Sequence, residues 1–113
     1  MPSHKIRKRR SDRLYVVYRV TCKPTGKRYI GLVVKEGTLQ YTLRRRLYQH
    51  IYRASVLGHD WTLHRTIREY GGEAFKIEVV ETVIGKLNGH EREVHWIKAE
   101  GDLNTNKKGG MKG

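Results

Sequence analysis

Two tyrosines, Tyr18 and Tyr29, lie in stretches whose composition predicts a β-hairpin. Residues 14–21 and 27–33 are rich in β-branched and aromatic side chains, and a Pro-Thr-Gly sequence between them suits a tight turn. Because side chains alternate along a strand, both phenols are expected on one face, roughly opposite each other. Gly31 should leave space above the sheet two residues beyond Tyr29, and we expect that space to hold a phosphate.

Tyrosine is a weak base at neutral pH, because its unperturbed pKa is about 10. A cationic neighbour is needed to lower that pKa. Lys27, on the same expected strand face as Tyr29, is one candidate for this neighbour, and Arg46 is another. We therefore assign Tyr18 and Tyr29 jointly to the activation and positioning of an attacking water. Cross-strand aromatic packing is the alternative for either ring alone.

Glu93 lies in a stretch, residues 90–100, that predicts a helix ended by a glycine. It precedes Trp96 by three residues and Ile97 by four, so it shares their inner face. A carboxylate beside tryptophan on a buried face is unfavourable unless it is paired or binds a metal ion. A lone carboxylate suits Mg²⁺, which keeps several water ligands and takes others from phosphate, and Mn²⁺ is the substitute ion. If Glu93 only neutralises a buried arginine, this chemistry is absent.

Arg46 and His50 lie in residues 42–54, where apolar side chains at four-residue spacing predict a helix capped by Thr38 or Thr42. Being four apart, they form a second row at the border of the apolar stripe. That row is expected to lie beside the sheet and still reach solvent. His50 is interpreted almost equally well as a surface or core-edge histidine. We expect the neighbouring cations to face solvent, namely Arg44 and Arg45.

Two further elements are predicted between these helices. Residues 61–70 have helical periodicity, with Asp60 as the expected cap and Leu63, Ile67 and Tyr70 as the expected inner stripe. Residues 74–83 alternate between apolar and polar side chains and predict a half-buried strand. The histidines and the tryptophan near this helix are interpreted as scaffold or as a DNA-facing surface: His59, His64 and Trp61.

The charge of the chain indicates a polyanion as its partner. The 113 residues carry 24 Lys and Arg against 11 Asp and Glu, a formal net charge of +13. This excess on a single domain is typical of nucleic-acid binders. There is one cysteine, so no disulfide within the chain is expected, and no apolar run is long enough to cross a membrane. We expect a soluble intracellular, cytoplasmic protein. The residues expected to contact DNA phosphates are Lys5, Arg7, Lys8, Arg9, Arg10 and Arg13 of a basic, disordered arm (residues 1–13), together with Arg44, Arg45, Lys107 and Lys108.

The order of these motifs resembles a known family. Val16-Val17-Tyr18 and Tyr29-Ile30-Gly31 lie on the two hairpin strands, Arg46 precedes His50 by four residues, and Glu93-Val94-His95-Trp96-Ile97 has a Glu-x-x-Trp-Ile pattern. This set resembles the GIY-YIG endonuclease family over residues 14–110, with residues 111–113 as a tail. The segment before Arg46 is longer than in the shorter members, and the spacing to His50 selects Arg46 among three consecutive arginines.

The resemblance implies an α+β fold in which helices flank a three-stranded antiparallel sheet. It implies a DNA endonuclease that hydrolyses phosphodiester bonds with Mg²⁺, in which Arg46, His50 and Glu93 are site residues and Asn104 or Asn106 hydrogen-bonds into the site. Asn104 is preferred, because Leu103 beside it is expected to anchor in the core. Small members of this family are often homing endonucleases of phages or mobile elements. Nicking and double-strand cutting both stay open, as does the oligomeric state, a monomer included. The alternative is a basic nucleic-acid-binding protein without catalysis, which an internally salt-bridged Glu93 and the lack of an exposed cleft would favour.

Overall fold

The computed structural model describes residues 13–105 of the chain and consists of three strands and three helices. In chain order they are β1 (Leu14–Cys22), β2 (Arg28–Val34), α1 (Leu39–Ser55), α2 (Thr62–Tyr70), a short 3-10 turn (Gly72–Ala74), β3 (Phe75–Ile84) and α3 (Lys86–Glu100).

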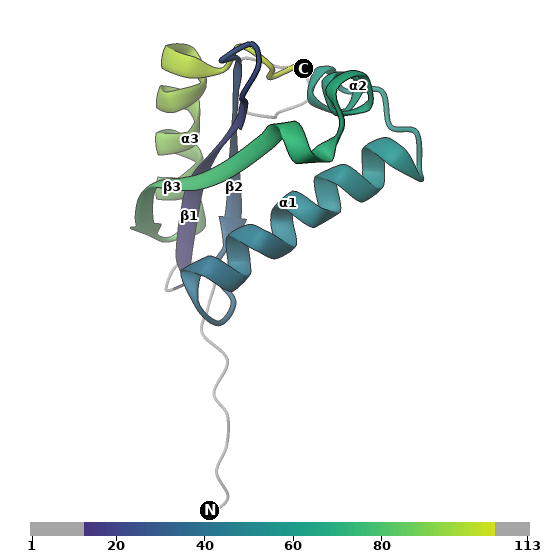
Figure 1. Cartoon of the computed structure of the whole chain (residues 1–113). Coiled ribbons are helices and arrows are strands. Elements are labelled where there is room, and N and C mark those ends of the chain that lie inside the picture. Colours follow the sequence, from purple (N-terminus) through teal and green to yellow (C-terminus); the bar gives the residue numbers. More distant parts are fainter. Residues whose placement is uncertain (1–12, 106–113) are drawn as a thin grey trace, which may run out of the picture.

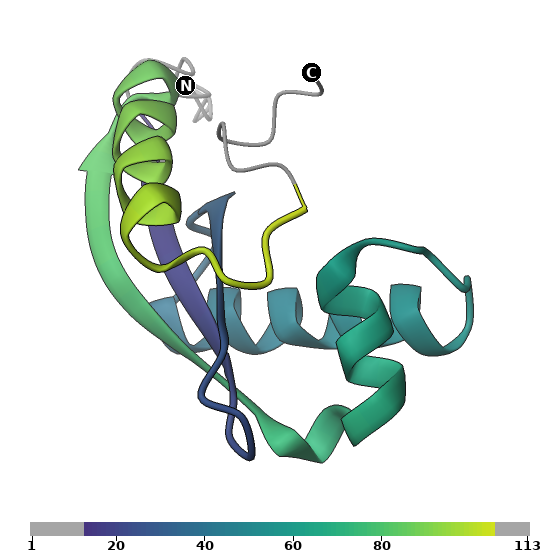
Figure 2. The same cartoon turned by 90° about the horizontal axis from the view of Figure 1, so that it is seen from above.

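The strands form one antiparallel sheet in the order β2-β1-β3, so the first strand is central. Helices α1 and α2 lie on one side of this sheet and α3 on the other (Figures 1 and 2). The predicted α+β fold with a three-stranded antiparallel sheet is therefore confirmed. No helix within residues 13–105 has the length and apolar character needed to cross a bilayer.

Alternation along β1 divides the core into two layers. Val16, Tyr18 and Val20 pack with Leu63 of α2 and with α1. Val17, one residue out of phase, packs with α3 on the other side. The central strand is thus buried on both faces, which is why it reads as a nearly continuous apolar run.

A β-bulge interrupts the pairing of β1 with β3 at the centre of the sheet. Val17 pairs with Glu81 and Tyr18 pairs with Val79, which leaves Val80 as the extra residue. The bulge shifts the alternation of β3 after Val79, because Glu81 shares the face of its pairing partner Val17. Glu81 therefore faces α3, where the carboxylate accepts hydrogen bonds from Trp96 Nε1 at 2.8 Å and from Arg92. Val79 stays in phase with Ile77 and is 36 % exposed on this edge strand.

The helix boundaries follow local hydrogen bonds. Thr38 caps α1 by accepting a hydrogen bond from the backbone N–H of Tyr41 at 3.0 Å, so the helix begins three residues earlier than predicted. Helix α3 also begins earlier, at Lys86. Its Gly89 permits close packing on β2, since a Cβ there would meet the side chain of Leu32 at 3.1 Å.

Helix α2 corrects two predictions. Asp60 does not cap it; its carboxylate instead pairs with Arg65 at 3.1 Å and with Arg68 at 3.8 Å. Tyr70, expected on the inner stripe, is 41 % exposed because it is the last residue of the helix and the chain turns away at Gly71. Leu63 and Ile67 are buried as expected, and His64 is the third buried residue of the helix.

Candidate active site

The tyrosines, the arginine and the histidine that the sequence singled out meet on the α1 side of the sheet. Tyr18 of β1 is fully buried, and its Oη lies 2.8 Å from His50 Nε2 of α1. Arg46, one helical turn earlier, donates from Nε to the same Oη at 3.3 Å. The ring of Tyr29 on β2 lies 6.3 Å from that of Tyr18 and 5.3 Å from that of His50. The structure therefore brings these four side chains together.

The hairpin register differs from the expected one. Tyr18 pairs with Gly31, and Tyr29 pairs with Val20, so the two phenols are diagonal neighbours on one face. The space above Gly31 is not free for a phosphate, because the ring of Tyr18 fills it. A Cβ at Gly31 would lie 2.3 Å from both Cζ and Oη of Tyr18. Gly31 thus allows the tyrosine to lie directly on β2, and that expectation of a phosphate site was wrong.

Arg46 has no partner carboxylate among residues 13–105. Besides Tyr18, its guanidinium donates to Gln49 Oε1 at 2.9 Å and to the carbonyl of Leu32 at 3.4 Å. These neutral acceptors orient the group without an ion pair, and the charge of Glu93 acts on it only from a distance. The two preceding arginines face solvent, as the sequence analysis expected. Arg44 and Arg45 are exposed, and Arg45 pairs with Glu36.

His50 also contacts a residue that the sequence analysis did not place at the site. Its Nδ1 lies 3.2 Å from Nε2 of His64, which is fully buried on α2. Burial and nearby cations, Arg46 foremost, lower the pKa of His50 to about 3, and burial lowers that of His64 to about 4. Both rings are therefore neutral at pH 7. The position of His64 next to Leu63 in a short helix gave no sign of this contact.

The tyrosines are held in their neutral form. Burial raises the pKa of Tyr18 and raises that of Tyr29 well above 10, and the negative charge of Glu93 acts in the same direction on both. The charge of Arg46 lowers both pKa values but does not outweigh burial. Lys27 lies in the exposed turn before β2 and is not among the groups that shift either pKa. The structure does not bring Lys27 to the site.

Glu93 approaches from the opposite side of the sheet, on α3, which packs mainly on the edge strand β2. It is 8 % exposed and pairs with His90 Nδ1 at 3.1 Å. Burial raises the pKa of Glu93, and His90 and then Arg46 offset part of the rise. Within residues 13–105 no arginine forms an ion pair with Glu93, and no three His, Cys, Asp or Glu side chains form a metal-binding cluster.

Asn104 is bound to the backbone of β2 beside Tyr29. Its Nδ2 donates to the carbonyl of Ile30 at 2.8 Å, and its Oδ1 accepts from the N–H of Ile30 at 2.9 Å. The backbone N–H of Leu103 donates to Arg28, and its side chain is buried, as expected. Both ends of the Asn104 amide are thus used to hold the C-terminal segment on the sheet edge, next to the site.

Comparisons with known proteins address the fold. No family model matches the chain, and no curated protein matches it. A solved structure does match: the catalytic domain of intron endonuclease I-TevI, determined as a point mutant, with a TM-score of 0.67. The match covers 88 % of this chain and 99 % of that domain, at 20 % sequence identity.

The chain has the fold of a GIY-YIG nuclease domain. The family resemblance drawn from the sequence is confirmed at the level of this fold. Most of the basic residues expected to contact DNA lie outside residues 13–105, the range that the structure describes. They are Lys5, Arg7, Lys8, Arg9, Arg10, Lys107 and Lys108. Arg13 is half-buried at the start of β1.

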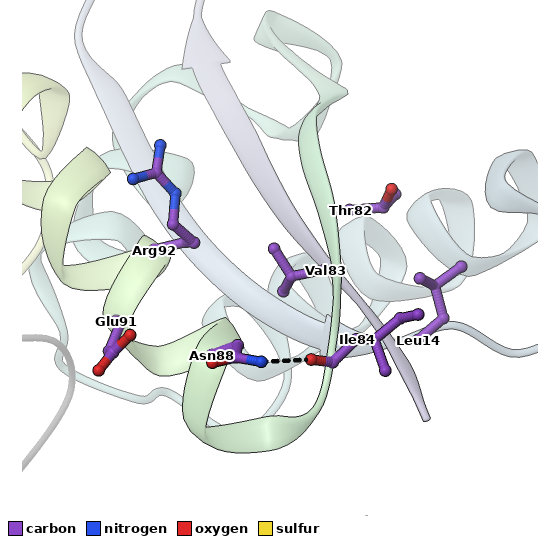
Figure 3. A pocket seen from close by; sticks show the side chains of 7 residues that line it. All are labelled: Leu14, Thr82, Val83, Ile84, Asn88, Glu91 and Arg92. Carbon is purple, nitrogen blue, oxygen red and sulfur yellow. Dashed lines mark hydrogen bonds between the residues drawn. The ribbon is translucent and has the colours of Figure 1, made fainter. Parts of the chain in front are cut away.

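A hollow of about 560 Å³ lies elsewhere on the GIY-YIG fold, between the end of β3 and the start of α3 (Figure 3). Asn88 lines it and donates from Nδ2 to the carbonyl of Ile84 at 2.8 Å. Arg92 and Glu91 reach it from α3. None of the side chains that meet at Tyr18 lines this hollow, so it is separate from the candidate active site.

Proposed function

We propose that the protein is a metal-dependent DNA endonuclease that hydrolyses phosphodiester bonds at one active site. The observation that carries this proposal is the position of Arg46: an arginine without a partner carboxylate in residues 13–105 touches Tyr18, and the field of Glu93 reaches both. A cation in contact with a phenol, and a carboxylate whose charge acts on both, are groups that phosphate-ester hydrolysis uses. The fold of an intron endonuclease domain supports the same class of reaction.

DNA is proposed as the substrate from charge and fold together. The net charge of +13 on 113 residues attracts a polyanion over long distances. Arg44 and the basic residues of the arm and the C-terminal tail would bind backbone phosphates. Such contacts hold DNA on the protein without reading its sequence. A single site cuts one strand at a time, so the activity starts as a nick.

Arg46 would bind the scissile phosphate. Its guanidinium is presented by α1 and oriented by neutral acceptors, so its charge is available to a phosphate oxygen. In the transition state the phosphate oxygens carry more concentrated charge, and a fixed donor of this kind stabilises that charge.

The phenols would position the attacking water. Tyr18 Oη accepts a hydrogen bond from Arg46, and Tyr29 lies beside it, so a water between phosphate and phenol would be oriented. Burial raises the pKa of Tyr18 and of Tyr29, so neither phenol is ionised at neutral pH. A neutral phenol can take a proton from water only if it gives its own proton to a neighbouring acceptor in the same step. His50 Nε2, at 2.8 Å from Tyr18 Oη and neutral at pH 7, is the acceptor within reach.

Glu93 is the residue that would hold a divalent cation. One nearly buried carboxylate, paired only with a histidine in the described part of the chain, fits Mg²⁺, which is bound by one or two carboxylates, phosphate and water. Mn²⁺ has similar ligand preferences. When bound, such an ion supplies Lewis-acid stabilisation to the phosphate and the leaving oxygen. The chain's own part is to place that carboxylate at the edge of β2, opposite Arg46.

The non-catalytic alternative rests on the pairing of Glu93 with His90. An internally neutralised carboxylate is what a simple DNA-binding protein would show. The partner is, however, a histidine whose side chain is 44 % exposed, and His90 carries charge only when protonated. The catalytic proposal therefore accounts better for a nearly buried Glu93.

Cleavage of supercoiled plasmid, with and without Mg²⁺, tests the proposal. We expect Mg²⁺-dependent nicking by the wild type, and none by Glu93→Gln, which keeps the side-chain shape but loses the charge. DNA affinity should stay equal or rise, since binding depends on Lys and Arg. Glu91→Gln is the matched control, an exposed acid on the same helix. A folded Glu93→Gln protein that cleaves at the wild-type rate would refute the metal assignment.

A further inference from the structure

A chain of three side chains leads from the candidate site to helix α2. Tyr18 Oη lies 2.8 Å from His50 Nε2, and His50 Nδ1 lies 3.2 Å from His64 Nε2. All three side chains are at most 1 % exposed. The last atom of the chain, His64 Nδ1, is buried and has no hydrogen-bond partner among residues 13–105.

The hydrogens of this chain can be arranged in two ways, since each neutral ring carries one proton. In the first arrangement Tyr18 donates to His50 Nε2, and His50 donates from Nδ1–H to His64 Nε2. In the second, every donor is reversed: His64 Nε2–H donates to His50, and His50 Nε2–H donates to Tyr18.

Arg46 favours the first arrangement. A guanidinium only donates, so one lone pair of Tyr18 Oη already accepts from Arg46 Nε at 3.3 Å. The hydroxyl of Tyr29 is a second donor to Oη, since this contact lowers the pKa of Tyr18 and raises that of Tyr29. In the second arrangement Oη would have to accept from His50 as well, although Arg46 and Tyr29 already occupy its two lone pairs. The first arrangement uses the O–H of Tyr18 as a donor to His50 and leaves both acceptor positions to Arg46 and Tyr29, and buried polar groups are nearly always paired.

We propose that His64 is a positioning residue of the candidate active site, which holds His50 in the tautomer that accepts the proton of Tyr18. The inference rests on the proposed function and assigns a role to a residue on α2, a different helix from α1, which carries Arg46 and His50. By accepting from Nδ1–H, His64 keeps His50 Nε2 free for Tyr18. The proton of Tyr18 then moves to His50 Nε2 as Oη takes a proton from water, and no proton is lost or gained.

The surroundings of His64 fit this role. Trp61 stacks on the imidazole with ring centres 5.2 Å apart and planes at 10°, which fixes the ring orientation. Burial lowers the pKa of His64, and the charges of His59, whose ring centre lies 5.6 Å away, and of Arg53 and Arg68 lower it further, so the ring stays neutral. A neutral imidazole retains the lone pair on Nε2 that His50 needs.

The test compares two substitutions of His64. His64→Leu removes the acceptor, and we expect single-turnover plasmid cleavage to slow by about 10- to 100-fold, the range seen when the partner orienting a functional histidine is lost. His64→Gln keeps an acceptor oxygen and should restore the rate to within a few-fold of wild type. Substrate affinity should be unchanged in both. His95→Gln, an exposed histidine on α3, is the control.

Nitrogen-15 NMR of the imidazoles separates this inference from the proposed function. In the wild type we expect His50 to carry its proton on Nδ1, and in His64→Leu to show a mixture of tautomers. A wild-type His50 protonated on Nε2 would overturn the inference, as would full activity in a folded His64→Leu protein or a His64→Gln protein as slow as His64→Leu. A wild type that cleaves no DNA refutes the proposed function, while the NMR result still decides the tautomer.

Discussion

Gly31→Ala should disable the site by displacing Tyr18. The added methyl carbon would lie 2.3 Å from Cζ and Oη of the Tyr18 ring, whereas carbon atoms in contact prefer about 3.5–4 Å. The ring must therefore move by about 1 Å or more. Tyr18 is 1 % exposed on the central strand, between neighbours on both sides, so there is no free space for that movement.

The size of the effect follows from what the movement breaks. Overpacking a core costs about 1–3 kcal/mol, and leaving His50 Nε2 unpaired costs about 1–3 kcal/mol more. At roughly 4 °C per kcal/mol for a domain of this size, the melting temperature should fall by about 10–20 °C. Cleavage should slow by about 100-fold below the melting range, the effect of a 1 Å misplacement of a reacting group.

A double-mutant cycle with Tyr18→Ala identifies the cause. Without the ring, Gly31→Ala should add almost no further destabilisation, so the coupling energy nearly equals the cost of the single substitution. Gly26→Ala is the contrasting variant. Its methyl would meet no atom within 4 Å, but φ is +75°, so only about 1 kcal/mol of backbone strain is expected, with the cleavage rate retained. If the Gly31→Ala protein melts and cleaves like the wild type, the ring of Tyr18 does not lie directly on Gly31.

Two further outcomes are expected. Arg46→Ala should lower the single-turnover cleavage rate by about 100-fold or more, the scale of losing one transition-state donor. Arg44→Ala should mainly weaken DNA binding, measured by filter binding or fluorescence polarisation. The opposite pattern would contradict the placement of Arg46 at the site. Acid should destabilise the fold as the pH falls below 6.5, down to about 4 for His64 and about 3 for His50, because these folded-state pKa values lie below the unfolded value of about 6.5. The unfolded state therefore binds more protons in this range. His50 alone should cost about 2 kcal/mol at pH 5. Melting curves recorded from pH 7 to 5 should show this loss of stability in the wild type and a smaller loss in His50→Gln. If both proteins lose the same stability over this range, His50 is not buried in its neutral form.

The sequence predicted the elements and several site residues because their signals are local. β-branched residues around a Pro-Thr-Gly turn predict a hairpin wherever it packs. Four-residue spacing places Arg46 and His50 in one row of a helix, and the three-residue spacing to Trp96 places Glu93 on an inner face. These periods come from the geometry of a single helix or strand, so they are visible without knowledge of the partners.

The register and the bulge were decided by tertiary packing. Tyr18 was expected opposite Tyr29 and lies opposite Gly31, because the strand ends and the turn, which local composition does not define to one residue, determine the pairing. Lys27, expected on the strand face of Tyr29, falls in the exposed turn because β2 begins one residue later. A bulge at Val80 shifted the alternation of β3, and nothing in its composition marked it.

The sequence by itself determined that this chain forms an α+β domain with a tyrosine-bearing hairpin, a basic helix and a helix with an inner glutamate. Only the tertiary structure decided that His64 completes a hydrogen-bonded chain to Tyr18 and that Arg46 has no partner carboxylate in residues 13–105. The reason is that burial and pairing belong to groups brought together from different elements. His64 is 14 residues from His50, and His50 is 32 from Tyr18, and neither helical nor strand periodicity extends across such separations.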